Sequence, residues 1–382
     1  MADRPRLAVL ASHPIPYQAP LFRELARDAR IDLHVLFLSR HGVSDRLDRD
    51  FGATFKWDVD LLSGYPSSFV FNLGERVTPG KPLSYMNPGI VRALRRVEPN
   101  VVLFFGMRSP SHLAALAWAR KAGIACLYRA ESNALRPLSR RALRRARALI
   151  GRMDGVVPIG TANEQYYDAL GIARARRHHA PYTVDNSFFR GKRISRREAR
   201  SAVDVQDGEV AVLFAGKLVA RKDPLTAVAA CAGLDTDVRL LIAGDGPLRA
   251  DLEPAAKSHG VKLTSLGFMN QHEIPLAYCA ADVLVVPSVE EPWGLVVNEA
   301  MCLGVPAVVS SCVGARLDLV ADDTTGGVFR AGDARDLRRV LAPFVASAER
   351  RATAGHAAEK RMDDWDLPHT RDGIVQAVLA HA

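Results

Sequence analysis

Short apolar runs alternate with amphipathic segments along almost the whole chain, and this alternation sets the expected fold. Apolar runs of four to eight residues, separated by stretches with helical periodicity, are typical of strands in a parallel sheet that helices cover on both faces. In the first half, the pattern predicts strands at residues 6–12, 31–39, 100–106, 124–130 and 155–160, and helices at 19–30, 88–97, 111–122 and 138–152.

The pattern restarts in the second half, after a polar and basic stretch at residues 186–200 that we interpret as a linker. Two successive series of this kind predict two doubly wound α/β domains, each with its ligand site at the carboxyl ends of its strands. The second series predicts strands at residues 209–216, 238–244, 261–267, 281–288, 307–311 and 326–331.

The clearest candidate chemistry lies around the fourth strand of the second series. This strand ends at Ser288, an acidic loop with Glu291 follows, and Gly294 begins a helix. Backbone N–H groups at a helix start bind anions, and a glycine lets a ligand approach the backbone closely. Glu291 and Glu299 would then flank a bound phosphate and contact sugar hydroxyls. Alternatively, both carboxylates only stabilise the N-terminal half of the helix.

Two lysines follow the strand that ends at Gly216. Lys217 and Lys222 have four residues between them. Cations at this end of a strand can neutralise a diphosphate and stabilise it as a leaving group while charge develops. Two loop lysines alone are more often simply solvated, but the acidic helix segment favours the phosphate site.

Together these two segments resemble the retaining GT-B glycosyltransferases of the family-4 type. Glu291 and Glu299, with seven residues between them, are similar to the E-x7-E motif of that family, with Trp293 where Phe is usual. Lys217 and Lys222 resemble its G-[RK]-L-x-x-x-K segment, in which Arg is commoner at the position that Lys217 occupies. The resemblance covers about residues 205–330 well.

The resemblance implies a GT-B fold, in which two Rossmann-like α/β domains face each other across a cleft. It implies an acceptor-binding domain over residues 1–186 and a nucleotide-sugar-binding domain over residues 187–362. It also implies a helical tail over residues 363–382 that packs back on the first domain.

On the donor side, the resemblance implies that Lys217 and Lys222 hold the diphosphate, that Glu291 orients the sugar, and that Glu299 binds the ribose. Gly294 and Leu295 would donate backbone N–H groups. The remaining donor-site candidates are Gly216, Gly246, Phe268 and Met269.

On the acceptor side, the candidates lie in the first half. His13 and Tyr17 follow the first strand, in a stretch that two prolines stiffen and where the family usually has a glycine-rich loop. Arg108 follows the strand after which the family often carries a histidine. Arg129 and Glu131 follow the next strand, where the family meets its acceptor; the alternative is an ion pair on the surface.

Composition narrows the class of protein. The chain has 382 residues, of which 48% are hydrophobic and 24% are charged, as in an ordinary globular protein with two cores. No apolar run reaches the roughly 20 residues of a membrane helix, the start does not resemble a signal peptide, and the five cysteines form no CxxC pair. We therefore expect a cytoplasmic protein with reduced thiols. No acidic D-x-D pair follows a clear buried strand, so no metal and no other cofactor is expected.

The net charge of +9 is unevenly distributed, with +13 in residues 1–190 and −4 in residues 191–382. A helix over residues 138–152 would place arginines around a narrow apolar stripe. This is either a solvated face or a surface for an anionic lipid or an anionic acceptor. Because the stripe has no Trp or Phe, membrane contact would be weak, peripheral and mainly electrostatic. No nucleic-acid motif accompanies the charge, so no nucleic-acid partner is expected.

The expected function is transfer of a sugar from a nucleoside-diphosphate sugar to an acceptor hydroxyl on a small molecule, a glycan or a lipid-linked molecule. Retention of anomeric configuration is implied by the resemblance alone. The alternatives are a nucleotide-sugar epimerase or hydrolase on the same fold, and a non-catalytic carbohydrate-binding protein. An NAD-dependent oxidoreductase is a further rival, but its glycine fingerprint is broken at Arg249.

Overall fold

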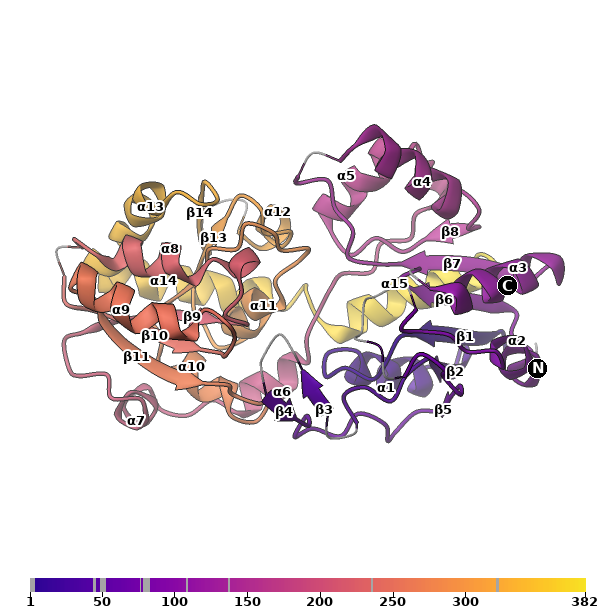
Figure 1. Cartoon of the computed structure of the whole chain (residues 1–382), viewed down its shortest axis with the longest axis horizontal. Helices are drawn as coiled ribbons and strands as arrows, with labels where there is room; N and C mark the ends of the chain where they lie inside the picture. Colours follow the sequence, from indigo (N-terminus) through magenta and orange to yellow (C-terminus); the bar gives the residue numbers. More distant parts are fainter. Residues whose placement is uncertain are drawn as a thin grey trace. The chain divides into compact units, whose positions relative to one another are not determined.

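The computed structural model describes residues 4–43, 46–48, 53–75, 77, 83–107, 109–136, 138–234, 236–320 and 323–382. The chain divides into two compact units (Figure 1), which we describe one at a time. Unit 1 comprises residues 1–46, 55–182 and 367–382, and unit 2 comprises residues 47–54 and 183–366.

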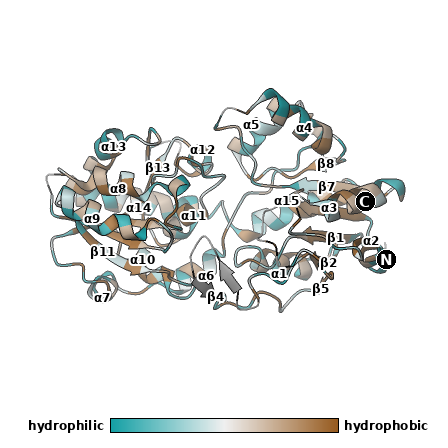
Figure 2. Ribbon diagram, in the orientation of Figure 1, coloured by the Kyte–Doolittle hydropathy of each residue, from teal (hydrophilic) through white to brown (hydrophobic). Residues whose placement is uncertain are grey.

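Unit 1 is built on a six-stranded parallel sheet with the strand order β5-β2-β1-β6-β7-β8. Its central strand β1 is buried on both faces because Leu7, Ala8, Val9, Leu10 and Ala11 have no exposed surface. Figure 2 shows the hydrophobic colouring of these inner strands. The strands are β1 (Arg6–Ala11), β2 (Asp32–Phe37), β5 (Ser67–Phe69), β6 (Val101–Phe105), β7 (Ala125–Arg129) and β8 (Gly155–Val156).

Two groups of helices cover the two faces of this sheet. Helices α1 (Ala19–Arg27) and α15 (Leu367–Leu379) pack together on one face, where Gly373 brings α15 so close that a Cβ there would lie 2.1 Å from the His179 carbonyl oxygen. The other face carries α2 (Ile90–Val97), α3 (Pro110–Lys121), α4 (Arg140–Ile150) and α5 (Thr161–Leu170), and the 3-10 turn η1 (Arg174–Arg176) follows.

Unit 2 repeats this architecture with the strand order β11-β10-β9-β12-β13-β14, again all parallel. Its strands are β9 (Val210–Ala215), β10 (Val238–Ala243), β11 (Lys262–Gly267), β12 (Val283–Val286), β13 (Ala307–Ser310) and β14 (Gly326–Phe329). Its helices are α6 (Asn186–Gly191), α7 (Arg196–Ala202), α8 (Pro224–Cys231), α9 (Arg249–His259), α10 (Ile274–Ala280), α11 (Leu295–Cys302), α12 (Arg316–Leu319), α13 (Ala334–Ala346) and α14 (Ala348–Arg361), with the 3-10 turn η2 (Ala220–Lys222). The short strands β3 (Arg46–Asp48) and β4 (Ala53–Phe55) form a separate pair.

The predicted fold class, two doubly wound parallel sheets with helices, is confirmed. Two local predictions are wrong. The polar sequence Ser67–Phe69 was not expected to form a strand, but it is β5. The expected linker at residues 186–200 contains α6 and the start of α7, and Asp185 and Ser195 cap these helices with hydrogen bonds of 2.9 and 3.2 Å from backbone N–H groups.

Among the residues that the structure describes, no helix is long and apolar enough to cross a membrane. The five cysteines are free, and three of them, Cys126, Cys231 and Cys302, are buried.

A buried ion cluster joins α7 and α14 to the start of β12. The Asp282 carboxylate accepts hydrogen bonds from Arg196, from Arg200 at 3.0 Å and from the backbone N–H of Ala211 at 2.8 Å, and it pairs with Arg351 at 3.0 Å. Asp282 is buried, so its charge depends on these donors.

We predict that Asp282→Asn lowers the free energy of unfolding by about 3 kcal/mol or more, because it leaves the largely buried guanidinium groups of Arg200 and Arg351 without a counter-charge. Urea unfolding followed by circular dichroism measures this loss. The matched control is Asp363→Asn, which removes a largely exposed pair with Arg190 and should cost less than about 1 kcal/mol. Equal losses in the two variants would contradict the account.

Candidate functional site

The strand order of unit 2 reverses between β9 and β12, and the loops that leave these two strands meet there. The chain moves outward from β9 to β10 and β11, but from β12 it moves the other way to β13 and β14. Because the strands are parallel, the loops at residues 216–223 and 287–294 leave the same edge of the sheet. Open parallel sheets bind their ligands at such a switch point.

Direct contacts join these two loops. The backbone N–H of Val289 donates to the Arg221 carbonyl oxygen at 2.9 Å. Lys222 and Glu291 form an ion pair, and only 16% and 8% of their side-chain surfaces are exposed. The Ser288 hydroxyl also donates to Glu291 at 3.3 Å. The structure therefore brings a predicted diphosphate-binding cation and the predicted sugar-orienting carboxylate into contact.

Gly294 allows α11 to begin beside Glu291. It is the N-cap of α11, and its φ of 100° is one that other residues rarely adopt. A Cβ at this position would lie 3.3 Å from Cγ of Glu291 and 3.2 Å from Cγ1 of Val313. Leu295 is the first residue of α11, and first-turn N–H groups have no partner within their helix. The helix start, Lys222 and Glu291 thus surround one point at the edge of the sheet.

Trp293, which departs from the Phe usual in the resembling family, is a core residue. It is 2% exposed and stacks on Trp365, with ring centroids 5.9 Å apart and planes at 15°. Its indole N–H donates to Asn298 at 2.9 Å. Trp293 therefore anchors the loop before α11 through contacts in the core.

Glu299 lies one turn inside α11 and is hydrogen-bonded to a side chain of the neighbouring helix α10. The Tyr278 hydroxyl on α10 donates to the Glu299 carboxylate at 2.5 Å. Glu299 is partly buried as a residue, and burial raises its pKa to about 7, which the hydrogen bond from Tyr278 only partly opposes. Glu299 is thus poised to change charge near neutral pH.

The other donor-site candidates lie along the same edge. Gly216 follows β9 and is approached so closely by the next loop that a Cβ on Gly244 would lie 1.9 Å from the Gly216 carbonyl oxygen. A Cβ on Gly246 would likewise lie 2.7 Å from the Leu218 carbonyl oxygen. Close backbone packing therefore requires glycine at positions 244 and 246, whether or not a ligand binds there. Lys217 is partly buried directly after Gly216, and Phe268 and Met269, also partly buried, follow β11.

Sequence reasoning missed two residues of this site, Ser288 and Tyr278. Ser288 is fully buried at the end of the β12 segment, where its position was visible in the sequence. Tyr278 lies 21 residues before Glu299, and only the packing of α10 against α11 brings it there.

In unit 1, the corresponding switch point lies between β1 and β6. His13 follows β1, with its Nδ1 3.0 Å from the Ser12 hydroxyl and its ring 5.1 Å from that of His41. Arg108, which follows β6, lies outside the described residues.

Arg129 at the end of β7 is buried. Its guanidinium donates to the carbonyl oxygens of Ala180 and Pro181 at 2.7 and 3.0 Å, and burial lowers its pKa to about 10. The surface ion pair considered for it is therefore wrong, because only 2% of Arg129 is exposed. Arg129 braces the segment that carries Tyr182.

Tyr182 links two of the acceptor-side candidates. Its hydroxyl donates to the Glu131 carboxylate, and its ring packs edge-on against Tyr17 with centroids 5.6 Å apart. Burial, with a smaller contribution from the charge of Glu131, raises the pKa of Tyr17. Tyr17 therefore stays protonated and can act as a hydroxyl donor.

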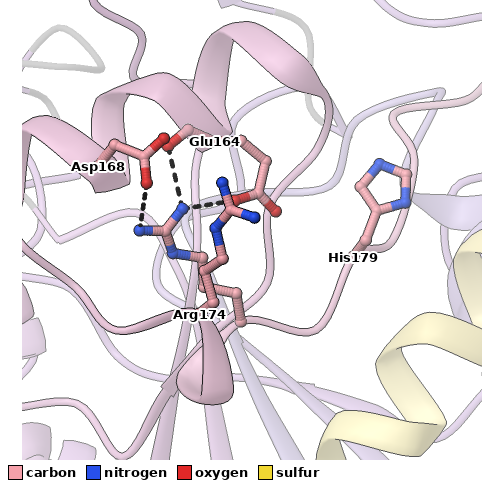
Figure 3. Close-up of a pocket in the computed structure, with 5 residues that line it drawn as sticks. Glu164, Asp168, Arg174 and His179 are labelled. Carbon is pink, nitrogen blue, oxygen red and sulfur yellow. Dashed lines mark hydrogen bonds and ion pairs between the residues drawn. The ribbon is translucent and has the colours of Figure 1, made fainter.

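A separate polar pocket of about 350 Å³ lies beside α5 in unit 1 (Figure 3). Arg177 pairs there with Glu164 at 2.9 Å and with Asp168 at 2.8 Å, and Arg174 and His179 complete the lining. None of the predicted site residues lines this pocket.

Within the described part of the chain, no group of three or more His, Cys, Asp or Glu side chains is arranged to hold a metal ion.

A family model matches the segment of the chain that carries the unit 2 site. Residues 195–361 match the family model described as glycosyl transferases group 1. This segment is therefore similar to a glycosyltransferase group 1 domain. It contains β9 to β14 and both loops of the switch point.

Named relatives agree with this match. The chain is 30% identical to an alpha-D-kanosaminyltransferase of Streptomyces kanamyceticus over 60% of this chain and 54% of that protein. It is 34% identical to a D-inositol 3-phosphate glycosyltransferase of Xylanimonas cellulosilytica over 54% of this chain and 53% of that protein. The chain thus spans about half the length of these relatives.

Solved structures match the whole chain. Anabaena HepE in complex with UDP and glucose aligns with a TM-score of 0.75 and 18% identity, covering 99% of this chain and 100% of that one. WaaG, a glycosyltransferase involved in lipopolysaccharide biosynthesis, aligns with a TM-score of 0.68 and 16% identity over 97% and 99%. The fold is that of the GT-B class.

We predict that the free energy of unfolding depends on pH because Glu299 titrates near neutral pH. The ordinary pKa of 4.5 applies to the unfolded chain, so the folded protein holds more protons between that value and about 7. The contribution of Glu299 to the free energy of unfolding is therefore present at low pH and is lost as pH rises through about 7. Melting temperatures measured from about pH 5 to about pH 8 should show this loss in wild type but not in Glu299→Gln. The control Glu253→Gln, on the exposed face of α9, should follow wild type. Parallel pH curves for wild type and Glu299→Gln would contradict the raised pKa.

Proposed function

We propose that the protein is a retaining, family-4-type glycosyltransferase that moves a sugar from a nucleoside-diphosphate sugar to an acceptor hydroxyl. The observation that carries this proposal is the contact of Lys222 with Glu291 beside the start of α11, at the switch point of a glycosyltransferase group 1 domain. The HepE structures that contain UDP and glucose or UDP-glucose support a nucleotide-sugar donor.

In this proposal, Lys222 and Lys217 neutralise the diphosphate, and the first N–H groups of α11 at Gly294 and Leu295 bind its oxygens. Glu291 accepts hydrogen bonds from the sugar, and Glu299 accepts them from the ribose. Gly216, Gly246, Phe268 and Met269 line the remainder of the donor site.

The transfer step follows from the resemblance to retaining enzymes. The acceptor oxygen bonds to the anomeric carbon on the face from which the diphosphate departs. The bond from that carbon to the diphosphate oxygen breaks, and the departing phosphate takes the acceptor proton. Charge develops on the diphosphate, where Lys222 is already in place, so little reorganisation is needed.

We predict that Lys222→Ala lowers kcat by about 100-fold or more, because one preorganised charge at the developing anion is lost. Steady-state transfer assays with the identified donor and acceptor measure this. Lys257→Ala, at an exposed lysine of α9, is the matched control and should keep wild-type turnover. Turnover of Lys222→Ala within a few-fold of wild type would exclude the phosphate assignment.

We predict that Glu291→Gln damages sugar transfer more than it damages binding of the free nucleoside diphosphate, and that Glu299→Gln weakens this binding itself. The reason is that Glu291 pairs with Lys222 at the transfer point, whereas Glu299 lies farther along α11. Calorimetry with the free nucleotide separates the two effects. If both variants lose the same affinity, the two carboxylates do not divide the donor in this way.

We propose that no metal takes part, because lysines and N–H groups are available to neutralise the leaving group. Activity should therefore persist after dialysis against EDTA, measured against an untreated sample. An enzyme that is inactive after chelation and recovers with magnesium or manganese would overturn this part of the proposal.

For the acceptor we propose a small molecule, a glycan or a lipid-linked molecule, bound in unit 1. His13, Tyr17 and Glu131 are the described candidates for contact with it, and Arg129 positions the Tyr182–Glu131 pair. Arg108 remains a prediction from the sequence.

We also propose a cytoplasmic location, which the free cysteines favour. The exposed arginines of α4 would add a weak, reversible contact with an anionic membrane surface, and salt should weaken that contact.

A further inference from the structure

The two carboxylates of the unit 2 site are held in different ways. Glu291 forms an ion pair with Lys222, whereas no cation pairs with Glu299 among the residues that the structure describes. Instead, the Tyr278 hydroxyl donates to Oε2 of Glu299 at 2.5 Å. A carboxylate that is withdrawn from water is costly to keep charged without a cation, so Glu299 gains more than Glu291 from a further hydrogen-bond donor.

Packing fixes the position of Tyr278. The residue has no exposed surface, and its ring packs edge-on against Phe189 of α6 with the ring centroids 6.4 Å apart. The Cys302 thiol at the end of α11 donates to the Asn186 side chain at 3.2 Å, which joins α6 to the helix that carries Glu299. Helices α6, α10 and α11 thus enclose the phenol, and its hydroxyl already points at Glu299 before a ligand binds.

The bond from Tyr278 occupies one oxygen of the carboxylate. It reaches Oε2, and within the described part of the chain no hydrogen bond or ion pair reaches Oε1 of Glu299. Glu299 is only partly buried whereas Tyr278 is fully buried, so the carboxylate is open on the side away from the phenol. A ligand hydroxyl can therefore approach the oxygen to which the protein does not bond.

Glu299 lies at a suitable distance from the start of α11. It is four positions beyond Leu295, the first residue of the helix, so their Cα atoms are about 6 Å apart along the helix axis. In a nucleoside diphosphate, the two adjacent ribose hydroxyls lie one sugar ring away from the phosphates. One helix can therefore bind phosphate with its first N–H groups and ribose hydroxyls with Glu299.

We propose that Tyr278 is a positioning residue of the donor site, and that the Tyr278–Glu299 pair selects ribonucleoside diphosphates over their 2′-deoxy forms. A ribose offers two adjacent hydroxyl donors to the carboxylate that Tyr278 holds in place, but a 2′-deoxyribose offers only one. Sites built to hydrogen-bond a substrate hydroxyl discriminate strongly against analogues that lack it. The inference rests on the proposed glycosyltransferase function and names the class of nucleotide in its donor.

Calorimetry of the full chain with UDP, GDP, ADP and the 2′-deoxy form of each tests the inference. The ribonucleotide that wild type binds most tightly should bind about tenfold or more tighter than its 2′-deoxy form. Tyr278→Phe removes only the hydroxyl, so affinity for that ribonucleotide should fall about tenfold and the preference for ribose should shrink. The matched control is Tyr65→Phe, which removes a phenol that donates to the Leu61 carbonyl in the unit 1 core. It should bind both nucleotides like wild type.

A double-mutant cycle with Glu299→Ala separates positioning from a general loss of packing. If Tyr278 acts through Glu299, adding Tyr278→Phe to Glu299→Ala should change the affinity by less than about twofold. The same loss from Tyr278→Phe in both backgrounds would show that the hydroxyl only supports the fold, and would overturn the positioning role.

The pH dependence of nucleotide affinity is a second readout. Burial raises the pKa of Glu299 to about 7, and the bond from Tyr278 opposes this. Because the charged carboxylate accepts from the ribose, affinity should fall as pH drops through this value. In Tyr278→Phe the fall should begin at a higher pH, because the hydrogen bond to the charged form is lost. Glu299→Ala should show only the titration of the nucleotide itself.

The other titratable groups near Glu299 do not produce such a step. The Tyr278 phenol on α10 and the Cys302 thiol on α11 stay protonated near neutral pH, because burial raises the pKa of both. The charged groups around Cys302 are the same in wild type and in Tyr278→Phe. They are Asp185 and Arg190 from the α6 segment and Glu359 from α14.

Three results would overturn the inference and leave the donor site in place. They are equal affinity of wild type for a ribonucleotide and its 2′-deoxy form, tighter binding of TDP than of any ribonucleotide, and identical pH profiles for wild type and Tyr278→Phe. If UDP, GDP, ADP and TDP all fail to bind at about 1 mM, the proposed donor site itself is wrong and the inference falls with it.

Discussion

The switch point between β9 and β12 is the constraint on which the unit 2 site depends. In a parallel sheet the carboxyl ends of all strands lie at one edge, and the strand order reverses between β9 and β12, where ligands of such sheets usually bind. Lys222 and Glu291, which are 69 positions apart in sequence, thereby form an ion pair, and their two loops share backbone hydrogen bonds. Without that topology, the same residues would be ordinary surface charges.

The Lys222–Glu291 pair has two consequences for a ligand. Both charges are largely buried. An anion that binds Lys222 must therefore replace the negative charge of Glu291 beside the lysine, and a hydrogen-bond donor must take the place of Lys222 beside Glu291. A molecule that carries phosphate and sugar together meets both needs, since phosphate pairs with the lysine and a hydroxyl donates to the carboxylate. Free phosphate meets only one of them.

The sequence predicted those parts of the fold that depend on local pattern. The runs at residues 6–12 and 209–216 are continuously apolar because they form inner strands whose two faces are covered by helices. The polar run at 67–69 was missed because β5 is an edge strand with only partly buried side chains. The helices within 186–200 were missed although Ser195 and Glu198 form a recognisable N-terminal signal.

The candidate site divides in the same way. Lys222, Glu291 and Gly294 were identified because strand ends and helix starts are visible in sequence. The Tyr278–Glu299 bond and the raised pKa of Glu299 depend on how α10 packs against α11, which no local pattern encodes. Burial of Arg129 likewise depends on the segment at Ala180 that folds over β7. Phe71 and Leu73 are of residue types that usually lie in the core, and only the tertiary structure shows that they are exposed.

The central claim is that the switch point of unit 2 is a nucleoside-diphosphate site. Titration calorimetry of the wild-type protein with UDP, GDP, ADP and TDP in turn, at neutral pH, tests it most directly. We expect at least one of the four to bind one-to-one with a Kd below about 0.1 mM and to raise the melting temperature further as its concentration increases. If none of them binds at about 1 mM, the account of this site is contradicted.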